Sequence, residues 1–207
     1  MPIQNYSELN DIQMDVLKEI GNIGSGNAAT SLSTMLDKPV IIDVPKVKIL
    51  EYQQVTEALG GPERMIVGLL LSLSGDISGM IMFLLEKDFA HMTLNSLLGE
   101  NLHDFADINE MGYSAIKEVA NIMAGSYVNA ISIMTGLEVH ISVPDMCIDM
   151  AGAILSVPAI HYANISDKMI FIEDKFSSEN YNATSHILLI PEVDSLDSIM
   201  INLGIDV

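Results

Sequence analysis

The chain has 207 residues, 49% of them hydrophobic, so it is long enough to bury a substantial core in one domain or in two small ones. With 9 Lys and Arg against 28 Asp and Glu, its formal net charge is −19. This charge argues against nucleic acid as a partner, because phosphate contacts need basic side chains, and it favours a basic protein surface instead.

Three features of the sequence bear on where the protein works. The single Cys147 cannot form an internal disulfide, and the N-terminal segment lacks the basic and apolar regions of a signal peptide. The most apolar run, residues 65–73, is too short to cross a bilayer. We therefore expect a cytoplasmic protein without membrane insertion.

The first predicted element is a long helix over residues 11–36. Gly21, Gly24 and Gly26 fall inside it, and each glycine costs about 1 kcal/mol in a helix. They indicate either a break in the helix or a close approach by another backbone.

The rest of the first half reads as strands followed by a helix. Residues 40–50 alternate loosely around Pro45, which predicts an edge strand or a strand with a bulge at the proline. A turn-rich segment follows, and residues 65–86 then form two apolar runs separated by Ser-Gly-Asp, which predicts a hairpin. A helix over residues 86–98 is closed by Gly99.

The second half is expected to repeat this order with adjustments. A helix over residues 104–135 ends at Gly136, and a closing helix covers residues 192–203. Between them we expect strands at residues 138–143, 152–161, 168–176 and 185–190.

The unit common to both halves is a helix, three strands and a helix, which predicts an α/β fold of the α+β type. Two pseudo-symmetric repeats, at about residues 11–100 and 104–206, would form a central, largely antiparallel sheet with the two long helices on one face. The join between the repeats is short and polar. A single domain over residues 1–207 is therefore expected rather than two.

One polar motif occurs twice, once in each long helix and the segment that follows it. The first copy consists of Asp15, Glu19, Asn22 and Pro45. The second copy lies 99 residues further on, without insertion, and consists of Ser114, Glu118, Asn121 and Pro144. The first copy begins DVLKEIGN and the second begins SAIKEVAN, which indicates a duplicated unit.

Helical geometry places the polar motif residues on one stripe, because positions i, i+4 and i+7 fall within roughly 60° of arc. The apolar residues of each helix are expected on a neighbouring, core-facing arc. In the first helix they are Ile12, Val16, Leu17, Ile20 and Ile23, and in the second Met111, Ala115, Ile116, Val119 and Ile122. A solvated helix face is the simplest interpretation of the polar stripe. It explains poorly why Asn, an unfavourable residue in mid-helix, recurs three positions after Glu.

The doubled pattern of Asp or Ser, Glu, Asn and a distant Pro resembles the signature of the CheC/CheX/FliY (CheC-like) family of chemotaxis response-regulator phosphatases. Both copies satisfy that pattern in full, and the chain resembles the members with two motifs more than those with one. The resemblance implies the CheC-like fold and hydrolysis of the aspartyl phosphate of the phosphorylated response regulator CheY. It also implies an association with CheD, a receptor-modifying deamidase.

The chemistry of this reaction suits the motif residues. Asn22 and Asn121 are expected to orient the attacking water, because a side-chain amide oxygen accepts a hydrogen bond from water as the glutamine of GTPases does. Glu19 and Glu118 are expected to pair with a cation of the regulator. Four residues support the motif: Asp15, Ser114, Pro45 and Pro144. No cofactor is expected in this chain, because the regulator brings the Mg²⁺.

Two other interpretations of the sequence remain to be weighed. The chain could be a non-catalytic adaptor that binds phosphorylated CheY, CheD or both through its paired motifs. Residues 24–29, GSGNAA, match a dinucleotide fingerprint in letters, but a charged helical segment precedes them where a strand is required. The five His lack the spacing of metal ligands.

Overall fold

The computed structural model describes residues 3, 5–99, 104–161, 168–178 and 181–205. The first half of the chain runs through η1 (Tyr6–Glu8), α1 (Asp11–Leu36), β1 (Ile41–Ile42), β2 (Lys46–Glu51), α2 (Tyr52–Ala58), β3 (Met65–Gly75), β4 (Gly79–Leu85) and α3 (Lys87–Leu98). The second half runs through η2 (Phe105–Asp107), α4 (Glu110–Thr135), β5 (Val139–Ile141), β6 (Asp145–Met150), α5 (Ala151–His161), β7 (Lys168–Ser178), β8 (Tyr181–Pro191) and α6 (Val193–Asn202).

The strands form one eight-stranded sheet in which every pairing of the described strands is antiparallel. The order is β1-β7-β8-β4-β3-β5, with β2 also paired to β7 and β6 also paired to β3. The predicted fold class, a mixed fold around a largely antiparallel sheet, is confirmed. The two halves are interleaved, because β1 and β2 of the first half pair with β7 of the second, and β5 and β6 pair with β3.

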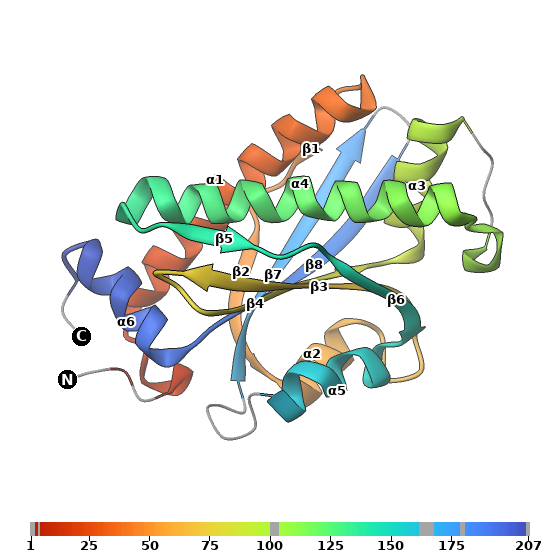
Figure 1. The fold of residues 1–207 in the computed structure, drawn as a ribbon. Coiled ribbons are helices and arrows are strands. Elements are labelled where there is room, and N and C mark those ends of the chain that lie inside the picture. Colours follow the sequence, from red (N-terminus) through yellow and green to blue (C-terminus); the bar gives the residue numbers. More distant parts are fainter. Residues whose placement is uncertain (1–2, 4, 100–103, 162–167, 179–180, 206–207) are drawn as a thin grey trace.

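The helices lie on both sides of this sheet. The long helices α1 and α4 pack side by side on one face, and α2 and α5 contact each other on the other side (Figure 1). Aromatic side chains fill the space between the layers, and Phe89 of α3 meets Phe176 of β7 edge to face, with ring centroids 5.1 Å apart. The two helices that carry the motif therefore share one face, as expected.

A buried polar cluster joins the two long helices to the sheet. The hydroxyl of Ser25 on α1 and that of Tyr127 on α4 each donate a hydrogen bond to Asp174 of β7, over 2.7 and 2.6 Å. The two hydroxyl oxygens lie 2.5 Å apart. Because the side chain of Asp174 is fully buried, desolvation raises its pKa to about 6, although both hydrogen bonds oppose the rise.

The glycines of the first helix do not break it, since α1 is continuous from Asp11 to Leu36. Two of them allow close packing by side chains rather than by the predicted backbone. A Cβ on Gly24 would lie 2.5 Å from the ring of Tyr127, and a Cβ on Gly21 would lie 2.8 Å from Val47. Gly26 has no such neighbour within 4 Å.

Several predicted elements agree closely with the structure. The helix over residues 11–36 is confirmed, the hairpin is formed by β3 and β4, and α3 ends at Gly99 in the left-handed conformation. The second long helix ends before Gly136 as expected, but it begins at Glu110 instead of residue 104, because the one-turn helix η2 precedes it.

The largest error concerns residues 152–161, which were predicted as a strand and form α5. The buried side chains Ala151, Ile154, Leu155 and Pro158 follow the spacing i, i+3, i+4, i+7, which is the period of a helix. The apolar composition concealed this period. The short α2 was also missed, and β6 was not predicted as a separate strand.

Two residues assigned to the apolar arc of the long helices are exposed instead. Ile12 and Met111 lie seven positions before Glu19 and Glu118, so each is aligned with a glutamate within about 20° of arc. They belong to the polar stripe and not to the core. The remaining members of both arcs are buried or partly buried.

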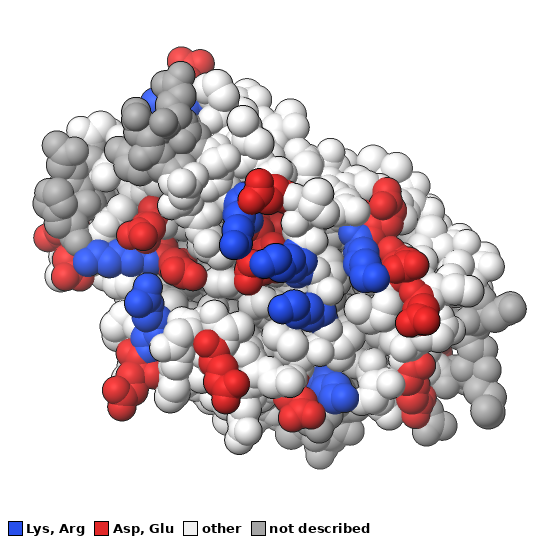
Figure 2. Space-filling view, turned by 180° about the vertical axis from the view of Figure 1, so that it is seen from behind, with Lys and Arg blue, Asp and Glu red and all other residues white. Residues whose placement is uncertain are grey.

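Basic and acidic side chains are interspersed on the face seen from behind (Figure 2). In the described residues, Lys and Arg side chains form ion pairs with acidic side chains, for example Lys46 with Glu173 of the neighbouring strand at 3.2 Å. Exposed ion pairs of this kind add little stability. Because the chain has 28 Asp and Glu but only 9 Lys and Arg, its carboxylates far outnumber their possible basic partners. Within the described residues, no helix is long and apolar enough to span a bilayer.

Candidate functional site

The two motif-bearing helices start at equivalent asparagines, which sets the phase of both motifs. Asn10 accepts a hydrogen bond from the backbone N–H of Gln13 (3.0 Å), and the Gln13 side chain accepts one in return from the backbone of Asn10 (2.9 Å). Asn109 accepts a hydrogen bond from the N–H of Gly112 at 3.0 Å. These caps stabilise the first turn, from which each motif stripe follows.

The motif residues lie on the outer side of both helices. Asp15, Glu19 and Asn22 of α1 are exposed. On α4, Ser114 and Glu118 are exposed and Asn121 is half-buried. Each Glu and Asn pair therefore shares one accessible stripe of its helix.

The two motif prolines occupy equivalent breaks in the edge of the sheet. Pro45 separates β1 from β2, and Pro144 separates β5 from β6, where a residue without an N–H interrupts no ladder hydrogen bond. A Cβ on Gly21 would lie 4.0 Å from Pro45 Cγ, so the first break packs against α1 next to Asn22.

The second copy forms a surface hollow of about 400 Å³. Four of its lining residues are those predicted from the sequence: Ser114, Glu118, Asn121 and Pro144. Lys117 and the segment Ile141–Val143 complete it. One wall is thus the polar stripe of α4, and the other is the largely apolar break between β5 and β6.

The functional groups of both motifs are free to bind a partner. In the described part of the chain, neither the amides of Asn22 and Asn121 nor the carboxylates of Glu19 and Glu118 form a hydrogen bond or an ion pair with another side chain. An amide offers both a donor and an acceptor, and a carboxylate can pair with a cation. Each stripe can therefore orient a small polar molecule beside a docked cation.

A lysine adjoins the glutamate in each copy, and sequence reasoning assigned it no role. Lys18 is held by Asp15, with Nζ 2.7 Å from Oδ1. Ser114 takes the place of that aspartate in the second copy, and in the described residues Lys117 forms no ion pair. The recurrence of Lys beside Glu in both copies was the signal that could have identified it. The hollow at the second motif thus presents an ammonium group, that of Lys117, without an ion pair in the described residues, whereas the ammonium group of Lys18 at the first motif is paired with Asp15.

No group of three or more His, Cys, Asp or Glu side chains is placed to hold a metal ion within the ranges that the structure describes. Cys147 lies on β6, outside both motifs, and is exposed. Partial desolvation and the negative charge of Asp149 raise the pKa of its thiol. The functional groups of the two stripes are thus amides, carboxylates and one lysine each.

Two solved structures share this fold. The solved structure of FliY from Thermotoga maritima superposes with a TM-score of 0.75 over 95% of this chain and 98% of that one, at 21% sequence identity. The middle domain of FliM from H. pylori superposes with a TM-score of 0.67 over 94% of this chain and 99% of that one, at 12% identity. The architecture is thus one that FliY and FliM share.

Sequence comparison then shows which proteins the chain resembles. Residues 12–49 and 111–148, which contain the two motifs, match the CheC-like family. The curated relative described as CheY-P phosphatase CheC, from Bacillus subtilis, is 28% identical over 203 residues, which cover 96% of this chain and 97% of the relative. The chain is therefore similar to CheC-like proteins at both motifs, and to this relative along nearly its whole length.

Proposed function

We propose that this protein hydrolyses the aspartyl phosphate of a phosphorylated chemotaxis response regulator, CheY. The observation that carries the proposal is the pair of exposed stripes, on α1 and α4, that each present an unengaged Glu and Asn beside a proline break. The relative described as CheY-P phosphatase CheC supports the same reaction. The match covers 96% of this chain and 97% of the relative, so both motifs lie within it.

The proposed mechanism divides the work between the two polar residues of each motif. The amide oxygen of Asn22 or Asn121 accepts a hydrogen bond from a water and holds it in line with the phosphorus atom. Glu19 or Glu118 pairs with a cation of the regulator and orients the docked complex. The Mg²⁺ that neutralises the phosphoryl oxygens belongs to the phosphorylated regulator and is part of the substrate.

The proposal is tested by following loss of label from ³²P-phosphorylated regulator, with wild-type protein and with the double variant Asn22→Ala/Asn121→Ala. We expect the double variant to lose nearly all acceleration but to bind the regulator with little change, because the amide acts mainly in the transition state. Wild-type rates in the double variant would contradict the mechanism.

A second variant, Glu118→Lys, tests the proposed docking role of the glutamate separately from the role of the asparagine in turnover. In an Asn22→Ala background, where only the second motif is intact, Glu118→Lys is expected to abolish association and not merely turnover, because it reverses the charge that meets the regulator's cation. If label persists with the wild-type protein while the regulator still binds, the chain is an adaptor. Repeating both arms with CheD present tests whether that proposed partner alters activity.

A further inference from the structure

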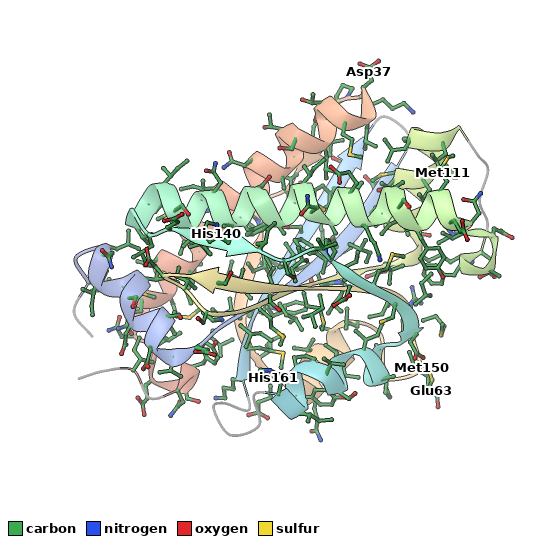
Figure 3. All side chains as sticks on the ribbon, viewed as in Figure 1. Asp37, Glu63, Met111, His140, Met150 and His161 are labelled. Atoms are coloured by element: carbon green, nitrogen blue, oxygen red, sulfur yellow. The ribbon has the colours of Figure 1, made fainter. Side chains whose placement is uncertain are left out.

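Two pairs of exposed hydrophobic side chains flank the two motifs at equivalent positions. Ile12 is 62% exposed and Met111 65%, and both lie in the first turn of their helix (Figure 3 labels Met111 on α4). Val44 and Val143 are each 82% exposed, and each directly precedes the motif proline. We call these four residues the apolar brackets.

A single exposed hydrophobic residue is common on protein surfaces. An exposed hydrophobic residue at the same position of both motif copies calls for an explanation. The two motif stretches expose three other large hydrophobic residues: Ile41, Tyr113 and Ile133. Their counterparts in the other copy are His140, Met14 and Thr34, none of which is an exposed large hydrophobic. Only the apolar brackets keep both apolar character and exposure in both copies.

The brackets are continuous with the proposed catalytic surface. Val143 lines the same hollow as Asn121 and Glu118. Ile12 and Met111 extend the polar stripe toward the N-terminus of each helix, about 10 Å along the helix axis from the glutamate, at a rise of about 1.5 Å per residue. Each motif therefore combines polar groups with exposed apolar side chains on its helix and beside its proline, and protein interfaces contain both kinds of contact.

Their exposure excludes a role in the core, so their partner lies outside the chain. We propose that the apolar brackets dock the receiver domain of the phosphorylated response regulator, contacting apolar side chains beside its phosphorylation site while the Asn enters that site. This inference rests on the proposed function. The occupant must fit two equivalent surfaces that each centre on a carboxylate and an amide, and the substrate of those groups meets that requirement.

The test removes the brackets and leaves the polar motif intact. Two double variants are compared, Val44→Ser/Val143→Ser and Ile12→Gln/Met111→Gln, each of which alters both sites. Ile133→Gln is the matched control for the helix residues, because it lies on α4 and is 70% exposed. Ile41→Ser is the control for the valines, because Ile41 lies on β1 and is 64% exposed.

We expect each double variant to raise KM for the phosphorylated regulator on the order of tenfold with kcat changed less than about twofold, because the brackets bind the docked regulator and do not contact the reacting atoms. Affinity for regulator activated with beryllofluoride should fall by a similar factor. The controls should match wild type in KM, affinity and thermal midpoint.

Four outcomes would overturn the inference. Bracket variants with wild-type KM and affinity would show that the side chains make no contact with the regulator, and equal changes in the controls would show a non-specific effect. A lower molar mass of the bracket variants in light scattering would assign the brackets to association between copies of this chain. If wild-type protein neither binds nor dephosphorylates the regulator, the proposed function fails and takes this inference with it.

Discussion

Asp174 makes the buried polar cluster sensitive to pH. Its carboxylate is fully buried and accepts hydrogen bonds from Ser25 and Tyr127, and desolvation still raises its pKa to about 6 from an ordinary value of 3.8. The folded state therefore keeps this proton to a higher pH than the unfolded chain does. Burial and the neighbouring carboxylate also raise the pKa of Tyr127, so its hydroxyl stays protonated and donates.

The sign of the resulting pH dependence follows from proton binding. Between about pH 4 and pH 6 the folded state binds more protons at Asp174 than the unfolded state, so its contribution to the free energy of unfolding falls as pH rises. The total fall is on the order of 1–3 kcal/mol. Above pH 6 the contribution stays low.

The variant Asp174→Asn isolates this effect from the other carboxylates. Urea unfolding of wild type and variant at pH 4.5 and pH 7 should show that the wild type loses more stability than the variant on going to the higher pH. Parallel pH profiles for the two proteins would refute the shifted pKa of Asp174.

At the scale of the elements, the approach of α1 to α4 depends on a glycine. The ring of Tyr127 occupies the space beside Gly24, so a methyl group there would lie 2.5 Å from its Cδ1 atom. Tyr127 cannot move aside freely, because its hydroxyl is fixed by Asp174 and Ser25. The two helices that carry the motifs are therefore held at a separation that only a residue without a side chain permits.

A pair of glycine substitutions tests this packing. Gly24→Ala should lower the free energy of unfolding by about 1–3 kcal/mol through overpacking, despite the better helix propensity of alanine. Gly26→Ala, two residues along the same helix with no neighbour within 4 Å, should raise it by up to about 1 kcal/mol. Equal urea midpoints for the two variants would contradict the close contact with Tyr127.

Sequence reasoning succeeded for elements whose signals are local. The bounds of α1 and the C-terminal ends of α3 and α4 follow from capping and glycine signals within a few residues. It failed for α5, because an apolar run of that length suits either a strand or a helix until its contacts are known. It also placed Ile12 and Met111 in the core, although their alignment with Glu19 and Glu118 could have corrected this.

At the scale of the whole molecule, neither half completes its own sheet. Strand β2 pairs with β7 from Lys46 to Glu51, and β6 pairs with β3 from Asp145 to Met150. Strand β4 also pairs with β8 of the other half. Each half alone therefore leaves an edge of both its long strands unpaired, which is an aggregation hazard. We propose on this ground that residues 1–207 fold as a single domain.

A fragment of residues 1–99 tests this proposal. Without β7 to pair with β1 and β2, and without α4 to cover α1, the fragment should lack cooperative unfolding in urea or assemble with further copies. Circular dichroism and light scattering measure the two outcomes. A monomeric fragment with a cooperative transition would mean that the halves are separate folding units.

The sequence by itself determined the two long helices, the doubled motif and its placement on one stripe of each helix. These depend on caps, helical period and residue spacing, all of which act over a few turns. Only the tertiary structure decided that the strands of the two halves interleave, that Ser25 and Tyr127 meet on Asp174, and that Val44 and Val143 stand exposed beside the motif prolines. These features join residues far apart in the chain, and burial and pairing at such distances are settled by the packing of the whole fold.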